Sequence, residues 1–200
     1  SIKNGCDLIK ANLIKKRSKD LLRKDRKLSI TMIARLDSIK DQETLIKAFL
    51  KTKNDQWELN LIGDGENKIY LQNLVNSLSG EKKIRFWGSR NNVIQILSNT
   101  EIFAFSTTKD EGFGIALIEA LSMGLPIIAS DVPACREVLM EEKAGVLVPP
   151  GDIKAWAENL SALMQYEHKR ILLRKKSQEI SNFYDIKIIA RNYWDFLKKI

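Results

Sequence analysis

The sequence has few of the residues that build metal centres or disulfide frameworks. Its 200 residues include one histidine, His168, two cysteines, Cys6 and Cys135, and no Asp-x-Asp pair. This composition predicts neither a metal centre nor a disulfide framework, and it is typical of a reducing compartment. No run of 18 apolar residues occurs, and the first residues lack the apolar stretch of a signal peptide, so we expect a cytoplasmic protein without a membrane span. Because the chain starts at Ser1 rather than at a methionine, we expect a piece of a longer protein.

Two common nucleotide-binding motifs are also missing. Gly63-Asp64-Gly65 begins like a Gly-x-Gly-x-x-Gly fingerprint, but Lys68 stands where the third glycine belongs, and the motif follows the second predicted strand instead of the first. No Gly-x-x-x-x-Gly-Lys-Ser/Thr loop occurs. The sequence therefore argues against a nicotinamide dinucleotide site and against a P-loop kinase or ATPase. Gly63 is expected in a tight turn beside a ligand-binding crevice.

The positive charge is concentrated at the two ends of the sequence. Residues 1–27 hold ten basic and three acidic residues, and residues 168–200 hold nine and three, so the middle of this +8 chain carries −5. Such ends could attract nucleic acid or an anionic membrane surface, or they could be solvated helix faces. Residues 1–27 lack the interleaved aromatic residues of a single-strand binding surface, and we expect no nucleic-acid partner.

Apolar residues recur with strand and helix spacing in alternation along the chain. Strand–helix alternation predicts a parallel sheet covered on both faces. We expect an α/β domain with a Rossmann-like, doubly wound parallel sheet of about six strands, in which ligands bind beyond the carboxyl ends of the strands. The predicted strands are residues 28–34, 57–62, 83–87, 102–105, 126–129 and 144–148; the predicted helices are 41–53, 66–78, 92–97, 113–123 and 152–164, with two more in 168–200.

Two cations follow the first predicted strand. Arg35 and Lys40 stand between this strand and the helix that starts near Asp41. Both side chains can reach the crevice, where a diphosphate would meet two positive donors and backbone N–H groups. The alternative is structural: Arg35 could pair with Asp37 or Asp41, and Lys40 could be solvated.

The most specific pattern follows the fourth predicted strand. Glu111 precedes a helix, and Gly112 and Gly114 let the backbone approach a ligand closely. The N–H groups of Gly114 and Ile115 at the helix start suit phosphate oxygens or sugar hydroxyls. Glu119 lies two turns further in an apolar stretch, where a carboxylate needs a partner such as vicinal hydroxyls. Glu111 could instead be only a negative charge at the helix start that the helix dipole stabilises, and Glu119 could form an internal pair with Arg or Lys.

These residues carry a family resemblance. Glu111-Gly-Phe-Gly-Ile-Ala-Leu-Ile-Glu119, followed by Gly124-Leu-Pro126 and Asp131-Val-Pro-Ala-Cys-Arg-Glu137, resembles the retaining nucleotide-sugar glycosyltransferases of the GT-B fold, the glycosyl transferases group 1. The resemblance covers about residues 2–195. It implies that Arg35 and Lys40 bind the donor diphosphate and that Glu119 holds the ribose hydroxyls.

The resemblance implies further roles near the same crevice. Glu111 and the backbone of Gly112, Phe113, Gly114 and Ile115 would hold the transferred sugar and the distal phosphate. Gly63 lies in the expected order, and the backbone near Arg90 would meet the base. Arg35, Lys40 and Glu111 would be the catalytic residues, with no metal and no cofactor beyond the nucleoside-diphosphate sugar, which the resemblance suggests is a UDP or GDP sugar.

The resemblance also implies a missing half. Members of the family are about twice as long, and their N-terminal domain holds the acceptor. Residues 1–200 are therefore expected to be the C-terminal, donor-binding domain, with helix 184–200 crossing to the acceptor domain and exposing apolar surface here. The implied function is retaining glycosyl transfer in cell-envelope polysaccharide or glycolipid synthesis, with peripheral contact at the inner membrane face. The alternative is a non-catalytic module that binds a nucleotide sugar or an anionic membrane.

Overall fold

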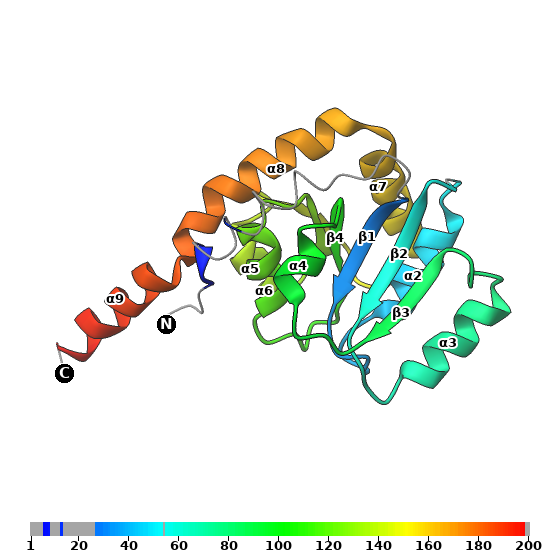
Figure 1. Ribbon diagram of the computed structural model, residues 1–200, viewed down its shortest axis with the longest axis horizontal. Coiled ribbons are helices and arrows are strands. Elements are labelled where there is room, and N and C mark those ends of the chain that lie inside the picture. The colour runs from blue at the N-terminus through cyan, green and yellow to red at the C-terminus, as the bar shows by residue number, and fades with distance from the viewer. Residues whose placement is uncertain (1–5, 9–12, 14–26, 54, 199–200) are drawn as a thin grey trace.

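The fold is organised by one six-stranded sheet. The computed structural model describes residues 6–8, 13, 27–53 and 55–198, and all the strands that it places in the sheet run parallel, in the order β3-β2-β1-β4-β5-β6 (Figure 1). This arrangement confirms the predicted doubly wound sheet. The strands are β1 (Leu28–Ile33), β2 (Trp57–Ile62), β3 (Ile84–Gly88), β4 (Ile102–Phe105), β5 (Ile127–Ser130) and β6 (Val146–Val148).

Strand alternation divides the apolar side chains between two cores. In β4, Ile102 and Ala104 belong to one buried cluster, while Phe103 and Phe105 belong to the other. Because successive side chains point to opposite faces of a strand, β4 packs against a core on each side. All four residues are at most 1% exposed, which is the burial expected for a central strand of a parallel sheet.

Helices cover both faces of the sheet, and most follow the predicted boundaries within a few residues. Helix α6, six residues that start at Pro133, was not predicted, because so short a segment shows little periodicity. The predicted helix 113–123 starts only at Ile115, since Gly114 adopts a left-handed conformation before it. The helices are α2 (Gln42–Lys51), α3 (Lys68–Ser77), α4 (Val93–Leu97), α5 (Ile115–Ser122), α6 (Pro133–Val138), α7 (Ile153–Gln165), α8 (Glu167–Ser181) and α9 (Ile186–Leu197), with a 3₁₀ turn at Asn182–Tyr184.

A glycine brings two strand ends into close contact. Gly63 follows β2 with a φ of +140°, and a Cβ atom at this position would lie 1.9 Å from the carbonyl oxygen of Ala34, which follows β1. The N–H of Leu36 donates to the carbonyl of Asp64 at 3.0 Å. Only glycine fits such an approach, and it supports the loop that carries Arg35. Gly63 itself forms an isolated bridge with Gly88, and the turn expected at Gly63 comes later, at Glu66 and Asn67.

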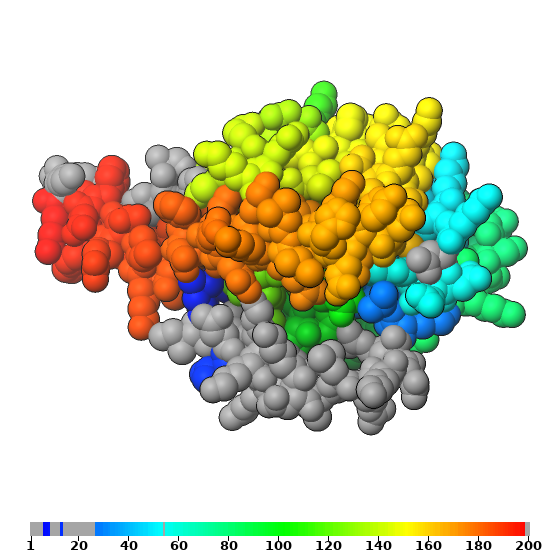
Figure 2. Space-filling view, turned by 90° about the horizontal axis from the view of Figure 1, so that it is seen from above, coloured from blue at the N-terminus to red at the C-terminus, as the bar shows by residue number. Residues whose placement is uncertain are grey.

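Helix α9 extends away from the body of the domain, as Figures 1 and 2 both show. Of its twelve residues only Ile189 is buried, whereas Tyr193, Trp194 and Phe196 are 46–61% exposed. The predicted apolar surface on this helix is therefore present. Cys6 runs beside the start of the helix, because its N–H donates to the carbonyl of Tyr184 at 2.8 Å. None of the helices described is both long and apolar enough to span a membrane.

Candidate functional site

The loop after β1 is shaped by the carboxylate of Asp37. One oxygen, Oδ1, accepts hydrogen bonds from the backbone N–H groups of Ile39 at 3.1 Å and Lys40 at 3.2 Å. Its other oxygen lies 3.0 Å from Nη2 of Arg35. The buried amide of Gln42 donates to the carbonyl of Arg35 at 2.7 Å and ties the loop to α2. Side chains of this kind commonly fix turns through local backbone bonds, and here they set where both cations start.

Lys40 and Glu111 meet between the ends of β1 and β4. The ammonium group of Lys40 forms an ion pair with Oε2 of Glu111, and the two side chains are 13% and 7% exposed. The ammonium also lies 5.0 Å from the ring centroid of Phe105, the last residue of β4, in a cation–π contact. Both charges therefore lie partly shielded from water, where each interaction is stronger than at the surface.

A buried thiol lies near this ion pair. Cys135 of α6 is fully buried, and burial raises its pKa to about 12, with the negative charge of Glu111 adding to the effect. The thiol therefore stays protonated at neutral pH, and it has the character of a small apolar side chain. Cys135 contributes packing to the floor of the site rather than charge.

The start of α5 lies beside the pair and is open. Gly114 has a φ of +73° and forms the N-cap without any side-chain hydrogen bond, and Ile115 in the first turn is 58% exposed. Gly112 is exposed, and a Cβ atom there would meet nothing within 4 Å. Phe113 packs against the core formed by α5 and α6. The segment 112–115 is thus exposed at Gly112 and Ile115, whereas Gly114 is buried and Phe113 packs inward.

Glu119 has no internal cation as a partner in the part of the chain that is described. It is half-buried one turn into α5, and burial raises the pKa of its carboxyl group. Cys6 lies near it, and the Cys6 thiol interacts with the Ser122 side chain. The alternative of a locked Glu119 pair with Arg or Lys is not realised among these residues. A half-buried carboxylate without a counter-charge is costly unless a ligand satisfies it.

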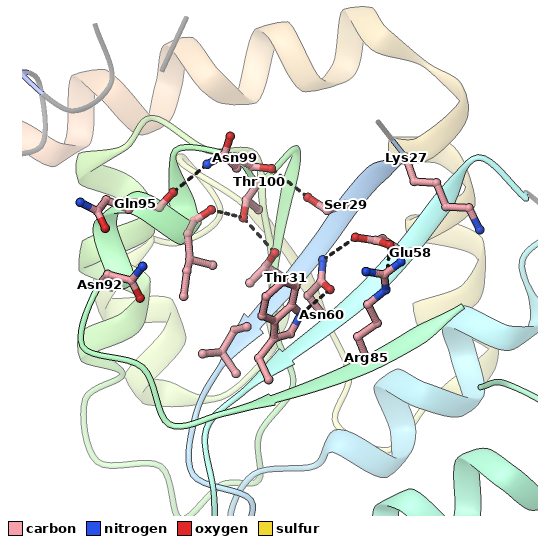
Figure 3. Close-up of a pocket in the computed structure, with 13 residues that line it drawn as sticks. Lys27, Ser29, Thr31, Glu58, Asn60, Arg85, Asn92, Gln95, Asn99 and Thr100 are labelled. Carbon is pink, nitrogen blue, oxygen red and sulfur yellow. Dashed lines mark hydrogen bonds and ion pairs between the residues drawn. The ribbon is translucent and has the colours of Figure 1, made fainter. Parts of the chain in front are cut away.

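Arg90 lies apart from the ion pair, after the edge strand β3. Its guanidinium carbon is 5.8 Å from the ring centroid of Trp87. Trp87 in turn borders a groove of about 690 Å³ on the α4 side of the sheet (Figure 3). Polar side chains line part of the groove: Nε1 of Trp87 donates to Asn60 at 2.7 Å, and Asn60 donates to Glu58 at 3.2 Å. It runs along the strands, so it is distinct from the crevice at their carboxyl ends.

The structure therefore brings some of the predicted residues together and separates others. Lys40 and Glu111 are in direct contact, and segment 112–115, exposed at Gly112 and Ile115, follows Glu111 in the chain. Arg35 is 75% exposed and paired with Asp37, as the structural alternative suggested. The sequence indicated Asp37 only as a partner of Arg35, and its role in shaping the loop was not predicted. The available signal was an aspartate placed just before Lys40 in a predicted loop, where such side chains often accept backbone N–H groups. No cluster of three metal-ligating side chains occurs among the residues described.

A parallel doubly wound sheet with paired charges at its carboxyl edge defines an α/β ligand-binding domain. The profile of the family described as glycosyl transferases group 1 matches residues 14–180. This chain belongs to that family.

Comparisons with individual proteins agree with this assignment. The chain is 28% identical over 195 residues to N-acetylgalactosamine-N,N'-diacetylbacillosaminyl-diphospho-undecaprenol 4-alpha-N-acetylgalactosaminyltransferase of Campylobacter jejuni, covering 97% of this chain and 52% of that protein. It is 27% identical over 172 residues to N-acetyl-alpha-D-glucosaminyl L-malate synthase of Bacillus anthracis, covering 83% and 45%. The chain thus spans about half the length of these two relatives.

A solved structure shares the fold over the whole chain. HepE of Anabaena in complex with UDP and glucose superposes with a TM-score of 0.86 at 23% identity, over 100% of this chain and 56% of HepE. At this identity the likeness establishes the Rossmann-like fold alone, and the bound UDP and glucose are properties of HepE.

Proposed function

We propose that this chain is the donor-binding domain of a retaining glycosyltransferase that uses a nucleoside-diphosphate sugar. The observation that carries the proposal is the shielded contact between Lys40 and Glu111, with Arg35 on the same loop as Lys40 and with the exposed Gly112 and Ile115 following Glu111 in the chain. The family assignment and the UDP present in HepE support it. Parallel α/β sheets bind nucleotides at this edge.

In the proposed reaction the cations stabilise the leaving group. When the bond between sugar and diphosphate breaks, negative charge grows on the leaving oxygen. Arg35 and Lys40 would bind the diphosphate, and the N–H groups at the start of α5 would add further donors. Glu111 and the backbone of 112–115 would hold the transferred sugar. Loss of one such preorganised donor in other enzymes lowers the rate by about 10²- to 10³-fold.

Two further contacts belong to the same proposal. Glu119 would satisfy its half-buried carboxylate on the ribose hydroxyls. The backbone near Arg90 would meet the base, although the Arg90 side chain itself lies over Trp87. Two carboxylates could instead form the acid and base of a glycosidase, but the ion pair of Glu111 with Lys40 favours a phosphate-binding role for this crevice.

Calorimetric titration of the 200-residue chain tests the proposal. UDP-, GDP- and ADP-sugars are titrated in turn, and binding of at least one below millimolar concentration is expected. Arg35→Ala should lower the affinity for the nucleoside diphosphate by about tenfold and leave the affinity for the nucleoside unchanged. The proposed role is refuted if none of the three classes of nucleotide sugar binds. It is also refuted if Arg35→Ala lowers the affinities for the nucleoside diphosphate and for the nucleoside equally.

The apolar surface of α9 supports a second, missing domain. An isolated helix with Tyr193, Trp194 and Phe196 exposed is unusual in a complete protein, and we propose that it contacts the N-terminal acceptor domain of a longer protein. The reading frame upstream of the codon for Ser1 tests this directly. An in-frame domain with its own parallel α/β pattern is expected, and an in-frame stop codon followed by a start site would contradict the proposal.

The alternative function is a non-catalytic module that binds an anionic membrane. The amphipathic helix α9, with the ammonium of Lys198 at its C-cap 5.4 Å from the ring centroid of Trp194, favours a peripheral contact of this kind. The basic residues 1–27, which lie largely outside the described residues, would add attraction. Vesicles containing phosphatidylserine, sedimented with the full chain and with residues 28–200, distinguish the two functions: binding without any nucleotide-sugar affinity would favour the module.

A further inference from the structure

Thr107 joins three strand ends at the centre of the site. Its hydroxyl oxygen lies 3.0 Å from the carbonyl oxygen of Ile39 and 3.1 Å from Oε2 of Glu111. Its backbone N–H donates to the hydroxyl of Ser130, at the end of β5, at 2.8 Å. The side chain is fully buried. Thr107 therefore lies between the loop that carries Lys40 and the loop that carries Glu111.

The single hydroxyl hydrogen decides which of these contacts is strong. Both neighbours are acceptors, because Ile39 offers a carbonyl and the ion-paired Glu111 offers a carboxylate. The Ile39 carbonyl already accepts the backbone N–H of Thr108 at 2.9 Å. The hydroxyl hydrogen can point to only one of the two acceptors at a time, and the bond to the charged carboxylate of Glu111 is the stronger of the two.

The two oxygens of Glu111 consequently have different surroundings. Oε2 is held by Lys40 and Thr107. Oε1 has no hydrogen-bond partner among the described residues. Because it does not belong to the fully buried polar atoms that lack a partner, it is not fully buried. One oxygen is fixed by the protein, and the other is left for a ligand.

We propose that Thr107 is a positioning residue that holds Oε2 of Glu111 so that Oε1 faces the sugar of the donor, which rests on the function proposed above. In the free protein Lys40 and Thr107 share the task. When Lys40 turns to the diphosphate, Thr107 becomes the remaining partner of Oε2. The hydroxyl thus matters more in the complex than in the free protein, and it matters most for ligands that carry a sugar.

The test compares Thr107→Val, Thr107→Ser and, as a matched control, Thr108→Val. For the nucleotide sugar that binds best, the affinity of the sugar nucleotide relative to its nucleoside diphosphate is measured by calorimetry. Thr107→Val should lower this ratio by about tenfold, the size expected for a lost bond to a charged group. Thr107→Ser keeps the hydroxyl and should give an affinity ratio within about twofold of the native value, and Thr108→Val should leave the ratio unchanged. An unchanged ratio in Thr107→Val, or a failure of serine to restore it, would overturn the proposal.

A second measurement does not depend on any ligand. The shift in the urea midpoint caused by Thr107→Val is measured in the native chain and in Glu111→Gln. A smaller shift in the Glu111→Gln background supports the Thr107–Glu111 bond, whereas equal shifts overturn it. If no nucleotide sugar binds, the function proposed above fails, and this cycle still decides whether Thr107 positions Glu111.

Discussion

Replacing Asp37 by alanine should destabilise the loop after β1 measurably. The change removes the acceptor of the Ile39 and Lys40 N–H groups, at 3.1 and 3.2 Å, and leaves both donors without that partner in a partly buried loop. The ion pair with Arg35 contributes little, because the Arg35 side chain is 75% exposed. Two backbone bonds to a charged acceptor predict a loss of about 1–3 kcal/mol in the free energy of unfolding.

Asp37→Asn separates the turn from the ion pair. Asparagine keeps an oxygen acceptor for the two N–H groups and removes only the charge beside Arg35, so its unfolding free energy should stay within about 1 kcal/mol of the native value. Urea denaturation followed by circular dichroism measures both variants. Equal losses in Asp37→Ala and Asp37→Asn, or no loss in either, would show that the backbone bonds do not hold the loop.

The same pair of variants has an expected effect on ligand binding. Asp37→Asn releases Arg35 from its internal carboxylate while the loop keeps its shape. If Arg35 binds a diphosphate, the affinity for UDP or GDP should rise by up to about fivefold, which is the worth of an exposed pair. Calorimetry at constant ionic strength measures this change, and a weaker affinity in Asp37→Asn would contradict the idea that Asp37 competes with the ligand.

Three further changes should show where the chain tolerates substitution. Gly63→Ala should cost about 1–3 kcal/mol in urea unfolding because the φ of Gly63 is +140° and the new Cβ would clash with Ala34. Gly112→Ala, where the Cβ meets open space, should be near neutral. Equal losses in the two variants would contradict the steric requirement for glycine at position 63. Trp156→Phe should cost well below the roughly 3–5 kcal/mol expected for Trp156→Ala, because the buried indole N–H has no hydrogen-bond partner among the described residues; similar losses would point to a partner outside them. Cys135, with a pKa of about 12 and no exposed surface, should resist iodoacetamide at pH 8, where its thiol is protonated, and react only in urea. Peptide mass spectrometry distinguishes it from the less buried Cys6, and rapid labelling of Cys135 in the native chain would refute its burial.

Much of the fold could be predicted because the strands are short, apolar and separated by periodic helices. The central strand 102–105 is recognisable as a run of four apolar residues, and such a run suits a strand with a core on each side. Helix α6 could not be predicted, because six residues beginning with Pro133 hold fewer than two turns. The start of α5 was misplaced by two residues, since apolar periodicity continues through Phe113 while the left-handed Gly114 breaks the backbone.

The site was predicted less completely than the fold. The sequence places Lys40 and Glu111 after strands that turn out to be neighbours, so their meeting follows from the parallel order of β1 and β4. Which cation meets which carboxylate depends on side-chain reach and burial, which a linear pattern does not encode. Arg35 therefore pairs with Asp37 two residues away, and the Thr107 hydroxyl contacts both Glu111, four residues further on, and the carbonyl of Ile39, which is far away in the chain.

The internal pairing of Lys40 has a consequence for ligand choice. A diphosphate that takes Lys40 leaves Glu111, only 7% exposed, with one hydrogen bond from Thr107 and no counter-charge. An uncompensated carboxylate at this depth is unfavourable. A ligand that also carries sugar hydroxyls can donate to Glu111 and remove that penalty, whereas a nucleoside diphosphate alone cannot. If the chain binds a nucleotide sugar as proposed, the arrangement should therefore favour the nucleotide sugar over the corresponding nucleoside diphosphate; a nucleoside diphosphate that binds as tightly as the nucleotide sugar would show that Lys40 and Glu111 do not separate on binding.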